Sequence, residues 1–492
     1  MLPRLYFRRR PEEVEGLRSQ FISSSCSVSY RNTGPLHISH GYKARLVDIN
    51  GIEYLDTRNN VAHCGHGHPE IVRAITYQVG QLQTNTRYLH PHASLLAKKL
   101  SDLLPRSLER VFFVNSGSEA NDLALRLARA YKMQQKGATH DARKDHTIVI
   151  DHGYHGHTLS TLDASAYKHR QGKEIDKCPA HLRIVPCPDV YRGVHSIKKS
   201  LPRKYDASLH KDKEQYCESE IEAANKYASY VEIECEKYPV SAFLIEGGMS
   251  VAGVILPPKS YLRRCIDAVH KAGGLYIADE VQTGFGRLGK CMWAFQYSNE
   301  NEGGVDEIIP DIVTVGKPFG NGQPLAAVIT TPCIASAFES LGVEYFNTFA
   351  ASPVQCAAGL AMLHVLSSEH LQKNADDVGN YLVELFSELQ SRCEWIGDIR
   401  GSGLFIGVEL VRDQHTLEPA TEETSFVCSI LKDKYKVLTS VDGAHENVMV
   451  IKPPLVFSRA DAALFVSCFE KALLVDLPMV KDRLKYFGRT PT

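Results

Sequence analysis

The chain has 492 residues, of which 43% are hydrophobic and 23% are charged, and its 56 basic and 57 acidic side chains give a formal net charge of −1. A chain of this length usually forms two or more domains, and its balanced charge argues against a nucleic-acid partner or an acidic partner. Thirteen scattered cysteines without a CxxC pair favour free thiols over a disulfide framework, and no apolar run is long enough to span a bilayer.

The N-terminus is rich in arginine. Arg4 and Arg8-Arg9-Arg10 occur before the first acidic residue, Glu12. Such a start is typical of a mitochondrial transit peptide, although Pro11-Glu12-Glu13 interrupts it at once. We therefore expect the mitochondrial matrix, with the cytosol as the alternative.

Strand and helix patterns follow in chain order. Residues 40–56 predict a β-hairpin around Asn50-Gly51, and residues 92–104 predict a helix. Short apolar runs then alternate with helical segments such as 120–129 and 261–272. These runs are 111–114, 147–150, 242–245, 275–278, 312–315 and 325–330. The alternation predicts an α/β protein with a mostly parallel or mixed sheet covered on both faces.

The remaining segments suggest a second, smaller domain. Residues 193–238 are polar and charged, which indicates a surface excursion followed by a helix. From about residue 354 the helical pattern dominates, and a strand-like run at 404–410 follows. We expect three parts along the chain: an N-terminal part of the small domain with a linker, a large domain, and the C-terminal part of the small domain. Their predicted ranges are 1–85, 86–352 and 353–492.

Residues 115–121, with the sequence Asn-Ser-Gly-Ser-Glu-Ala-Asn, lie between a predicted strand and a predicted helix. Small residues at a helix N-terminus let backbone N–H groups approach an anion. The alternative is an ordinary serine N-cap followed by a glutamate. If a phosphate binds here, Gly117 and Ser118 are the best candidates, with Ser116 in support.

Asp279 ends a run that is expected to be a buried strand. A carboxylate in that position can keep a pyridine nitrogen protonated. It could also cap a loop or serve as the acid of a nucleoside triphosphatase, because residues 284–291 nearly form a P-loop. The P-loop interpretation fails because Cys291 replaces the Mg²⁺-binding serine or threonine and no helical pattern follows.

Lys317 follows the next apolar run and is flanked by Gly316 and Pro318. A lysine in a desolvated site loses its proton more readily and can form a Schiff base and act as a general base. A lone lysine is normally a solvated surface residue. Together with a phosphate cradle and Asp279, however, Lys317 completes the set of groups that pyridoxal 5′-phosphate requires.

Two histidine clusters, at 63–68 and 152–157, raise the question of a metal site. Neither has the helical spacing or the downstream acid of a metalloenzyme. Both are punctuated by glycine, so we expect loops near the cofactor and no metal. In the second loop either Tyr154 or His155 could stack on the cofactor ring.

With these residues in place, the chain resembles the class III aminotransferase family of pyridoxal-phosphate enzymes over residues 28–475. The matching stretches are 59–69, 115–122, 154–158, 277–287, 316–318 and 399–404. The resemblance implies fold type I: a large domain with a mixed, mostly parallel seven-stranded sheet, and a smaller α+β domain built from both termini. Within the family, the chain is most similar to the ethanolamine-phosphate and 5-phosphohydroxy-L-lysine phospho-lyases, a group also labelled alanine–glyoxylate aminotransferase 2-like. That likeness lies in stretches 84–90, 320–324, 343–349 and 451–454.

The resemblance also implies roles for individual residues. Lys317 would form the Schiff base, Asp279 would pair with the pyridine nitrogen, and Thr348 would complete the phosphate site of the partner subunit in a homodimer or a dimer of dimers. The other implied cofactor residues are Ser116, Gly117, Ser118, Tyr154, His155, Glu246, Val281 and Gln282, with Tyr154 and Val281 on opposite ring faces and Gln282 at the ring hydroxyl. Arg400 matches the arginine that binds the substrate carboxylate in the aminotransferases. The other expected substrate residues are Asn60 and, from local context only, Arg87 and His90.

Three functions remain open at this point. The first is a phospho-lyase that eliminates phosphate and ammonia from phosphoethanolamine or 5-phosphohydroxy-L-lysine. The second is an aminotransferase that uses glyoxylate or pyruvate, and the third is a protein that binds pyridoxal phosphate without turnover. Two departures from family patterns bear on the choice. Residues 246–250 lack the aminotransferase pattern Glu-Pro-x-Gln-Gly, and Met249 and Ala350-Ala351 replace the Gln and Gly-Gly of the phospho-lyases.

Overall fold

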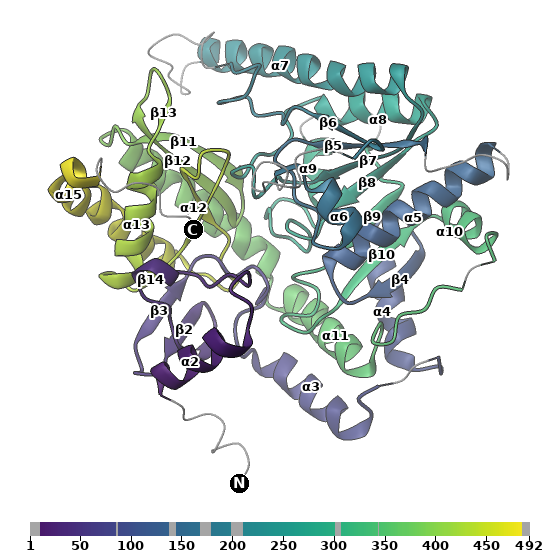
Figure 1. The fold of residues 1–492 in the computed structure, drawn as a ribbon, viewed down its shortest axis with the longest axis horizontal. Helices are drawn as coiled ribbons and strands as arrows, with labels where there is room; N and C mark the ends of the chain where they lie inside the picture. Colours follow the sequence, from purple (N-terminus) through teal and green to yellow (C-terminus); the bar gives the residue numbers. More distant parts are fainter. Residues whose placement is uncertain are drawn as a thin grey trace.

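A seven-stranded sheet forms the centre of the computed structural model (Figure 1). The structure describes residues 10–84, 87–136, 144–167, 179–197, 210–300, 307–342 and 344–484. The predicted transit segment before residue 10 and the part of the polar excursion at 198–209 therefore lie outside the described residues.

The order of this sheet is β4-β10-β9-β8-β7-β5-β6, and only β10 runs antiparallel to its neighbours. Its strands are β4 (Arg110–Val114), β5 (His146–Ile150), β6 (Leu182–Val185), β7 (Val240–Glu246), β8 (Leu275–Asp279), β9 (Ile312–Val315) and β10 (Ala326–Thr330). The predicted mixed, mostly parallel α/β sheet is confirmed. The sequence patterns missed β6, because this edge strand has only four residues and Arg183 interrupts its apolar character.

Helices cover both faces of the sheet, as a parallel sheet requires. On one face, α5 (Gly117–Lys136) packs across the strands and is itself covered by α6 (Leu159–Ala164) and α10 (Pro332–Glu339). On the other face lies α8 (Tyr261–Lys271), with α7 (His210–Lys237) outside it (Figure 1). The short α9 (Ala294–Glu300) follows the loop after β8.

The predicted hairpin is present and joins the two ends of the chain. β2 (Arg45–Asp48) and β3 (Glu53–Asp56) are antiparallel, and β1 (Ile38–Tyr42) pairs with β2. Asp48 closes the turn, since its Oδ1 accepts from the backbone N of Asn50 at 2.8 Å and of Ile52 at 2.9 Å. β3 then pairs in parallel with β14 (Val437–Leu438) from the C-terminal part. This pairing is consistent with a small domain from both termini, and its exact boundaries stay a prediction.

The C-terminal part contains an antiparallel sheet with helices against it. The sheet consists of β11 (Ile396–Ser402), β12 (Phe405–Asp413), β13 (Glu418–Pro419), β15 (Ser440–Asp442) and β16 (Val448–Ile451). Its helices are α12 (Leu371–Gln390), α13 (Thr421–Asp433), α14 (Arg459–Lys471) and α15 (Leu477–Leu484), and a π-helical turn, η4 (Ala472–Asp476), joins the last two. The long α11 (Pro353–Ser368) precedes them and packs against α3 (Pro69–Gln81) and α4 (Pro91–Asp102). Two short N-terminal elements, α2 (Pro11–Phe21) and η1 (Arg31–Thr33), complete the chain.

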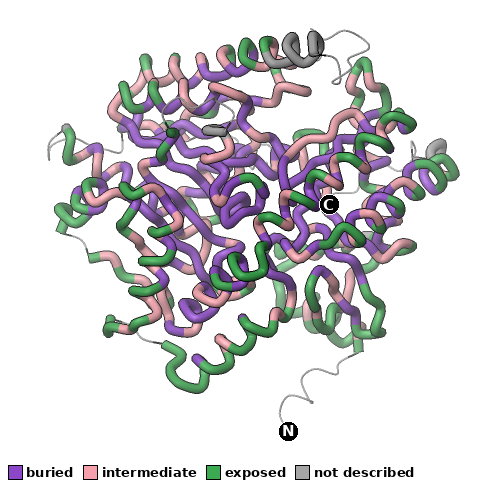
Figure 2. The backbone as a smooth tube through the Cα atoms, turned by 180° about the vertical axis from the view of Figure 1, so that it is seen from behind, coloured by how far each residue is buried: buried purple, intermediate pink, exposed green. Residues whose placement is uncertain are grey.

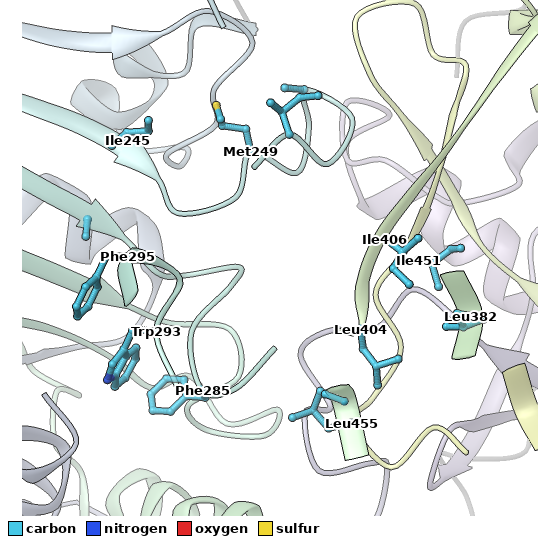
Figure 3. Packing of buried hydrophobic residues seen from close by; sticks show 14 of the residues in the cluster. Ile245, Met249, Phe285, Trp293, Phe295, Leu382, Leu404, Ile406, Ile451 and Leu455 are labelled. Carbon is cyan, nitrogen blue, oxygen red and sulfur yellow. The ribbon is translucent and has the colours of Figure 1, made fainter. Parts of the chain in front are cut away.

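One hydrophobic core runs from the central sheet into the C-terminal part. Figure 2 shows buried backbone along the sheet and exposed residues on α2 and α3. Figure 3 shows Phe285 and Trp293 on one side of this core and Leu404 and Leu455 on the other. Apolar burial of this kind contributes about 25 cal/mol per Å². The two halves of the protein, the part built on the seven-stranded sheet and the C-terminal part, therefore stabilise each other. Every cysteine whose side chain is described is a free thiol.

Arg287 links the same two halves through polar contacts. Its side chain is fully buried and donates to the backbone carbonyls of Leu404 and Pro453. It also donates to Nδ1 of His63, at 3.1 Å. Burial and the nearby guanidinium lower the pKa of His63 to about 3, so this imidazole is neutral and accepts the bond. Arg287 therefore connects the loop after β8 to the segment that follows β16.

None of the helices in the described ranges is long and apolar enough to cross a membrane.

Candidate functional site

The C-terminal ends of β7, β8 and β9 meet the N-terminus of α5 at one edge of the sheet. Asp279, the last residue of β8, lies in register between Glu246 on β7 and Thr314 on β9. Lys317 follows β9 by two residues. A cavity of about 370 Å³ opens here. Its lining is Val61, Asn115, Ser116, Gly117, Ser118, Asn121, Tyr154, His155, Gly156, Asp279, Val281, Gln282, Gly316, Lys317, Gly322, Gln323, Pro324 and Leu325.

The carboxylate of Asp279 is buried and held by three donors. Its Oδ2 accepts from Asn121 Nδ2 at 2.7 Å and from His155 Nδ1 at 2.8 Å, and its Oδ1 accepts from Val281 N at 3.0 Å. Because a carboxylate only accepts, His155 must carry its proton on Nδ1. These bonds stabilise a negative charge that would be costly to bury alone.

Asn121 is a site residue that the sequence patterns did not identify. Thr314 Oγ1 donates to its Oδ1 at 2.7 Å, and its Nδ2 also donates to the carbonyl of His155 at 2.8 Å. Asn121 lies four residues after Gly117 on α5, so the two share a helix face. That spacing was the available signal, but its meaning depends on contacts with β8 and β9.

Lys317 lines the cavity together with Asp279. Burial lowers the pKa of its ammonium, and the carboxylates of Asp279 and Glu246 oppose that shift. A lysine with a lowered pKa carries a neutral amine more often, which a Schiff base and a general base both require.

The small residues at the start of α5 line the same cavity. Gly117 is the first residue of this helix, and Ser116 Oγ accepts from Glu119 N at 3.1 Å, as an N-cap does. Ser118 Oγ accepts from the backbone N of His157 at 3.0 Å. The helix N-terminus brings backbone N–H groups and a favourable partial charge to an anion. A phosphate cradle, an acid and a lysine thus surround one cavity, and this donor set fits pyridoxal phosphate.

The residues predicted to contact the cofactor ring also meet here. Tyr154 and Val281 both line the cavity, whereas the ring of His155 is held by its hydrogen bond to Asp279. Of the two residues considered for stacking, Tyr154 is therefore the better candidate. Glu246 accepts from the backbone N of Tyr154 at 3.0 Å, and burial raises the pKa of this glutamic acid to about 7. Gln282 lines the cavity and accepts a hydrogen bond from Asn60, which is buried behind it.

Six of the predicted residues do not line the cavity of their own chain as far as it is described: Glu246 and Asn60, whose contacts are given above, and four others. Arg87 is exposed, lies 4.0 Å from Glu344 and stacks over the ring of Phe346. His90 caps α4 by accepting from the backbone N of His92. The exposed Thr348 and the partly buried Arg400 are the other two. Their predicted roles stay predictions.

Arg400 already has partners of its own. Its Nη1 donates to Asp398 and to Glu409, both at 2.8 Å, and its Nε donates to the carbonyl of Gly253 at 2.8 Å. Its side chain is only 15% exposed. An anionic substrate would have to compete with two carboxylates for this guanidinium.

The histidine clusters have partners other than metals. His63 contacts Arg287, His66 contacts Asp56 at 2.8 Å, and His68 contacts Glu369 at 3.0 Å. No group of three His, Cys, Asp or Glu side chains suited to a metal ion occurs in the part of the chain that the structure describes.

Comparisons with known proteins agree with this site. The family model described as aminotransferase class-III matches residues 26–473. Alanine–glyoxylate aminotransferase 2-like of Drosophila melanogaster is 42% identical, covering 94% of this chain and 87% of that protein. Ethanolamine-phosphate phospho-lyase homolog 1 of Caenorhabditis elegans is 37% identical, covering 94% of each. The mitochondrial alanine–glyoxylate aminotransferase 2 of Homo sapiens is 34% identical, covering 89% of this chain and 82% of that protein.

A solved structure is similar as well. It is a phospholyase from Arthrobacter in complex with phosphoethanolamine, with a TM-score of 0.77 and 33% identity. The similarity covers 94% of this chain and 99% of the Arthrobacter chain.

Replacing Gly117 should weaken cofactor binding. In Gly117→Ala the new Cβ would lie 2.7 Å from Val281 Cγ1, closer than side chains tolerate. We expect cofactor affinity, measured by equilibrium dialysis, to fall at least about tenfold, which corresponds to about 1.4 kcal/mol. In a Val281→Ala background the same glycine substitution should cost less, since the clash is gone. Gly80→Ala, whose Cβ meets nothing within 4 Å, is the control. Unchanged affinity in Gly117→Ala would contradict this geometry.

Proposed function

This chain belongs to the class III aminotransferase family, whose members use pyridoxal phosphate, and we propose that it is a phospho-lyase within that family. Its substrate would be phosphoethanolamine or 5-phosphohydroxy-L-lysine. With water, the amine would yield an aldehyde, ammonia and inorganic phosphate.

The observation that carries this proposal is the state of Arg400. An aminotransferase acting on alanine and glyoxylate must bind a carboxylate on the carbon that carries the amine, and Arg400 was the predicted anchor for it. Asp398 and Glu409 both accept from Nη1 of that guanidinium, and the carbonyl of Gly253 accepts from its Nε. In both proposed lyase substrates the carbon that carries the reacting amine has no carboxylate. The likeness to the Arthrobacter phospholyase and to the C. elegans phospho-lyase homolog supports the same choice.

The chain's own residues account for the proton chemistry. Bound pyridoxal phosphate supplies an electron sink for the carbon that carries the amine. Asn121 and His155 hold Asp279 in its charged form, and this carboxylate would pair with the pyridine nitrogen of the bound cofactor. Lys317, with its lowered pKa, removes the proton from the substrate carbon as general base. The C–O bond on the neighbouring carbon then breaks, and the phosphate leaves with the electron pair.

The alternative is an aminotransferase that uses glyoxylate or pyruvate. It needs the same Lys317 and Asp279, and the name of the D. melanogaster relative favours it. The two activities share fold and cofactor, so the residues of the substrate pocket determine which of the two reactions occurs.

We also propose that the enzyme is a homodimer or a dimer of dimers. Exposed apolar side chains gather on the segments at 87–89 and 344–349: Tyr88, Leu89, Phe346 and Phe349 are 81%, 102%, 47% and 60% exposed. Arg87 contacts both Phe346 and Glu344, so the two segments lie together. Thr348 is part of this surface, which would place it at a partner's phosphate cradle. An apolar patch of this kind is typical of an interface.

A mitochondrial location is the proposal for the compartment, with the cytosol as the alternative. The H. sapiens relative is named mitochondrial, and the arginine-rich N-terminus suits import.

The lyase should release phosphate without a keto acid. Purified enzyme given phosphoethanolamine or 5-phosphohydroxy-L-lysine should produce phosphate and ammonia in equal amounts, and Lys317→Ala should produce neither because it lacks the general base. A coupled assay for phosphate and a second for ammonia measure this. Amino transfer to glyoxylate or pyruvate without phosphate release would instead establish the aminotransferase.

Thr348 should act across the subunit interface. A Thr348→Glu homodimer should bind the cofactor weakly, because its carboxylate repels the phosphate, and a Lys317→Ala homodimer should be inactive. Mixed dimers of the two, purified with two affinity tags, contain one site with both residues intact and should recover activity. Inactive mixed dimers would place Thr348 in its own subunit's site, and normal cofactor binding by the Thr348→Glu homodimer would place it in none.

Cell fractionation checks the compartment. The full chain with a C-terminal tag should sediment with mitochondria and be protected from added protease, whereas Arg4→Ala/Arg8→Ala/Arg9→Ala/Arg10→Ala should stay in the cytosol. If both forms are cytosolic, the mitochondrial proposal is wrong.

A further inference from the structure

Lys452 is a buried cation with few partners. It follows β16, is 8% exposed, and donates from Nζ to Ser250 Oγ at 2.7 Å. Asp442 Oδ2 is 4.0 Å away, beyond hydrogen-bond distance. An ammonium has three donors, and Ser250 occupies one of them. A buried charge in this state is costly unless an anion completes its surroundings.

A chain of polar contacts connects this cation to the lining of the cavity. Ser250 N approaches Glu246 Oε2 at 3.5 Å, and Glu246 Oε1 accepts from the backbone N of Tyr154, which lines the cavity. Figure 3 shows the residues that precede Ser250 and Lys452, Met249 and Ile451, on facing sides of the junction between the two halves.

The surrounding charges agree with this position. Burial lowers the pKa of Lys452 to about 8; Asp442 and Glu246 oppose the shift, and Lys317 and Arg58 add to it. The positive charge of Lys317 thus repels the ammonium of Lys452. A second positive group near Lys317 is unfavourable in the empty site and becomes favourable when an anion binds between or beside them.

We propose that the Lys452 ammonium, oriented by Ser250, binds the phosphate group of the substrate. This inference rests on the proposed phospho-lyase function and assigns its anion-binding residue. Arg400 was the expected residue, but its guanidinium is paired with two carboxylates, whereas Lys452 has donors to spare. When the C–O bond breaks, its electron pair moves to the bridging oxygen and the phosphate gains one negative charge. An ammonium at that group stabilises the charge as it develops.

A non-reacting analogue tests the binding without turnover. In 3-aminopropylphosphonate, a methylene replaces the bridging oxygen of phosphoethanolamine, so the compound carries the same amine and a similar anion but cannot lose phosphate. Its dissociation constant for the holoenzyme is measured from the change in cofactor absorbance. Butylamine, which lacks the anion, is the control ligand.

We expect Lys452→Met to weaken phosphonate binding by about 10- to 100-fold, the range for a lost charged hydrogen bond. Butylamine binding should change little. Lys452→Arg should retain most of the phosphonate affinity, and Ser250→Ala should show a smaller loss than Lys452→Met. If Lys452→Met does not fold or loses the cofactor, the phosphonate affinities of Lys452→Arg and Ser250→Ala are compared with that of wild type. A loss in Ser250→Ala that exceeds the loss in Lys452→Arg then supports the proposal, and wild-type affinity in both overturns it.

The proposal is overturned if the variants bind phosphonate as wild type does, or if butylamine loses affinity to the same extent. Failure of the lyase function has a different outcome. Wild type would then release no phosphate from phosphoethanolamine, while phosphonate binding would still depend on Lys452.

Discussion

The burial of one negative charge, on Asp279, organises the site. The carboxylate stands at the end of a strand that is buried along its whole length, where a lone charge would be very unfavourable. Donors from α5, from the loop after β5 and from its own loop stabilise it. Because each donor comes from a different segment, satisfying this charge also fixes where the N-terminus of α5 and the loop that carries Tyr154 lie.

Positive charges at the junction of the two halves are arranged in three ways. Arg287 is buried against carbonyls and a neutral histidine and connects the halves structurally. Arg400 is neutralised by Asp398 and Glu409. Lys452 donates to Ser250, which contacts Glu246, and keeps further donors available. The same kind of charge therefore serves as a structural link, a paired ion and a binding group, and the number of nearby carboxylates decides which.

This arrangement explains why the family alone does not determine the reaction. In the roles proposed for them, Lys317, Asp279 and the N-terminus of α5 would serve any amine that binds the cofactor. The choice between elimination and amino transfer depends on which anion the junction accepts and where that anion sits on the substrate. We propose Arg400 and Lys452 as residues through which the chain makes that choice.

The sequence by itself determined the parts that local patterns encode. Strands with apolar runs, the hairpin at Asn50-Gly51, and the positions of Gly117, Asp279 and Lys317 at strand or helix ends were all predictable, because periodicity and turn chemistry are short-range. Only the tertiary structure decided the partners of Asp279 on other elements, the ion pairs of Arg400, and the approach of Lys452 to Ser250. Those contacts join residues far apart in the chain, and no local pattern records which distant side chains the packing of the sheet will bring together.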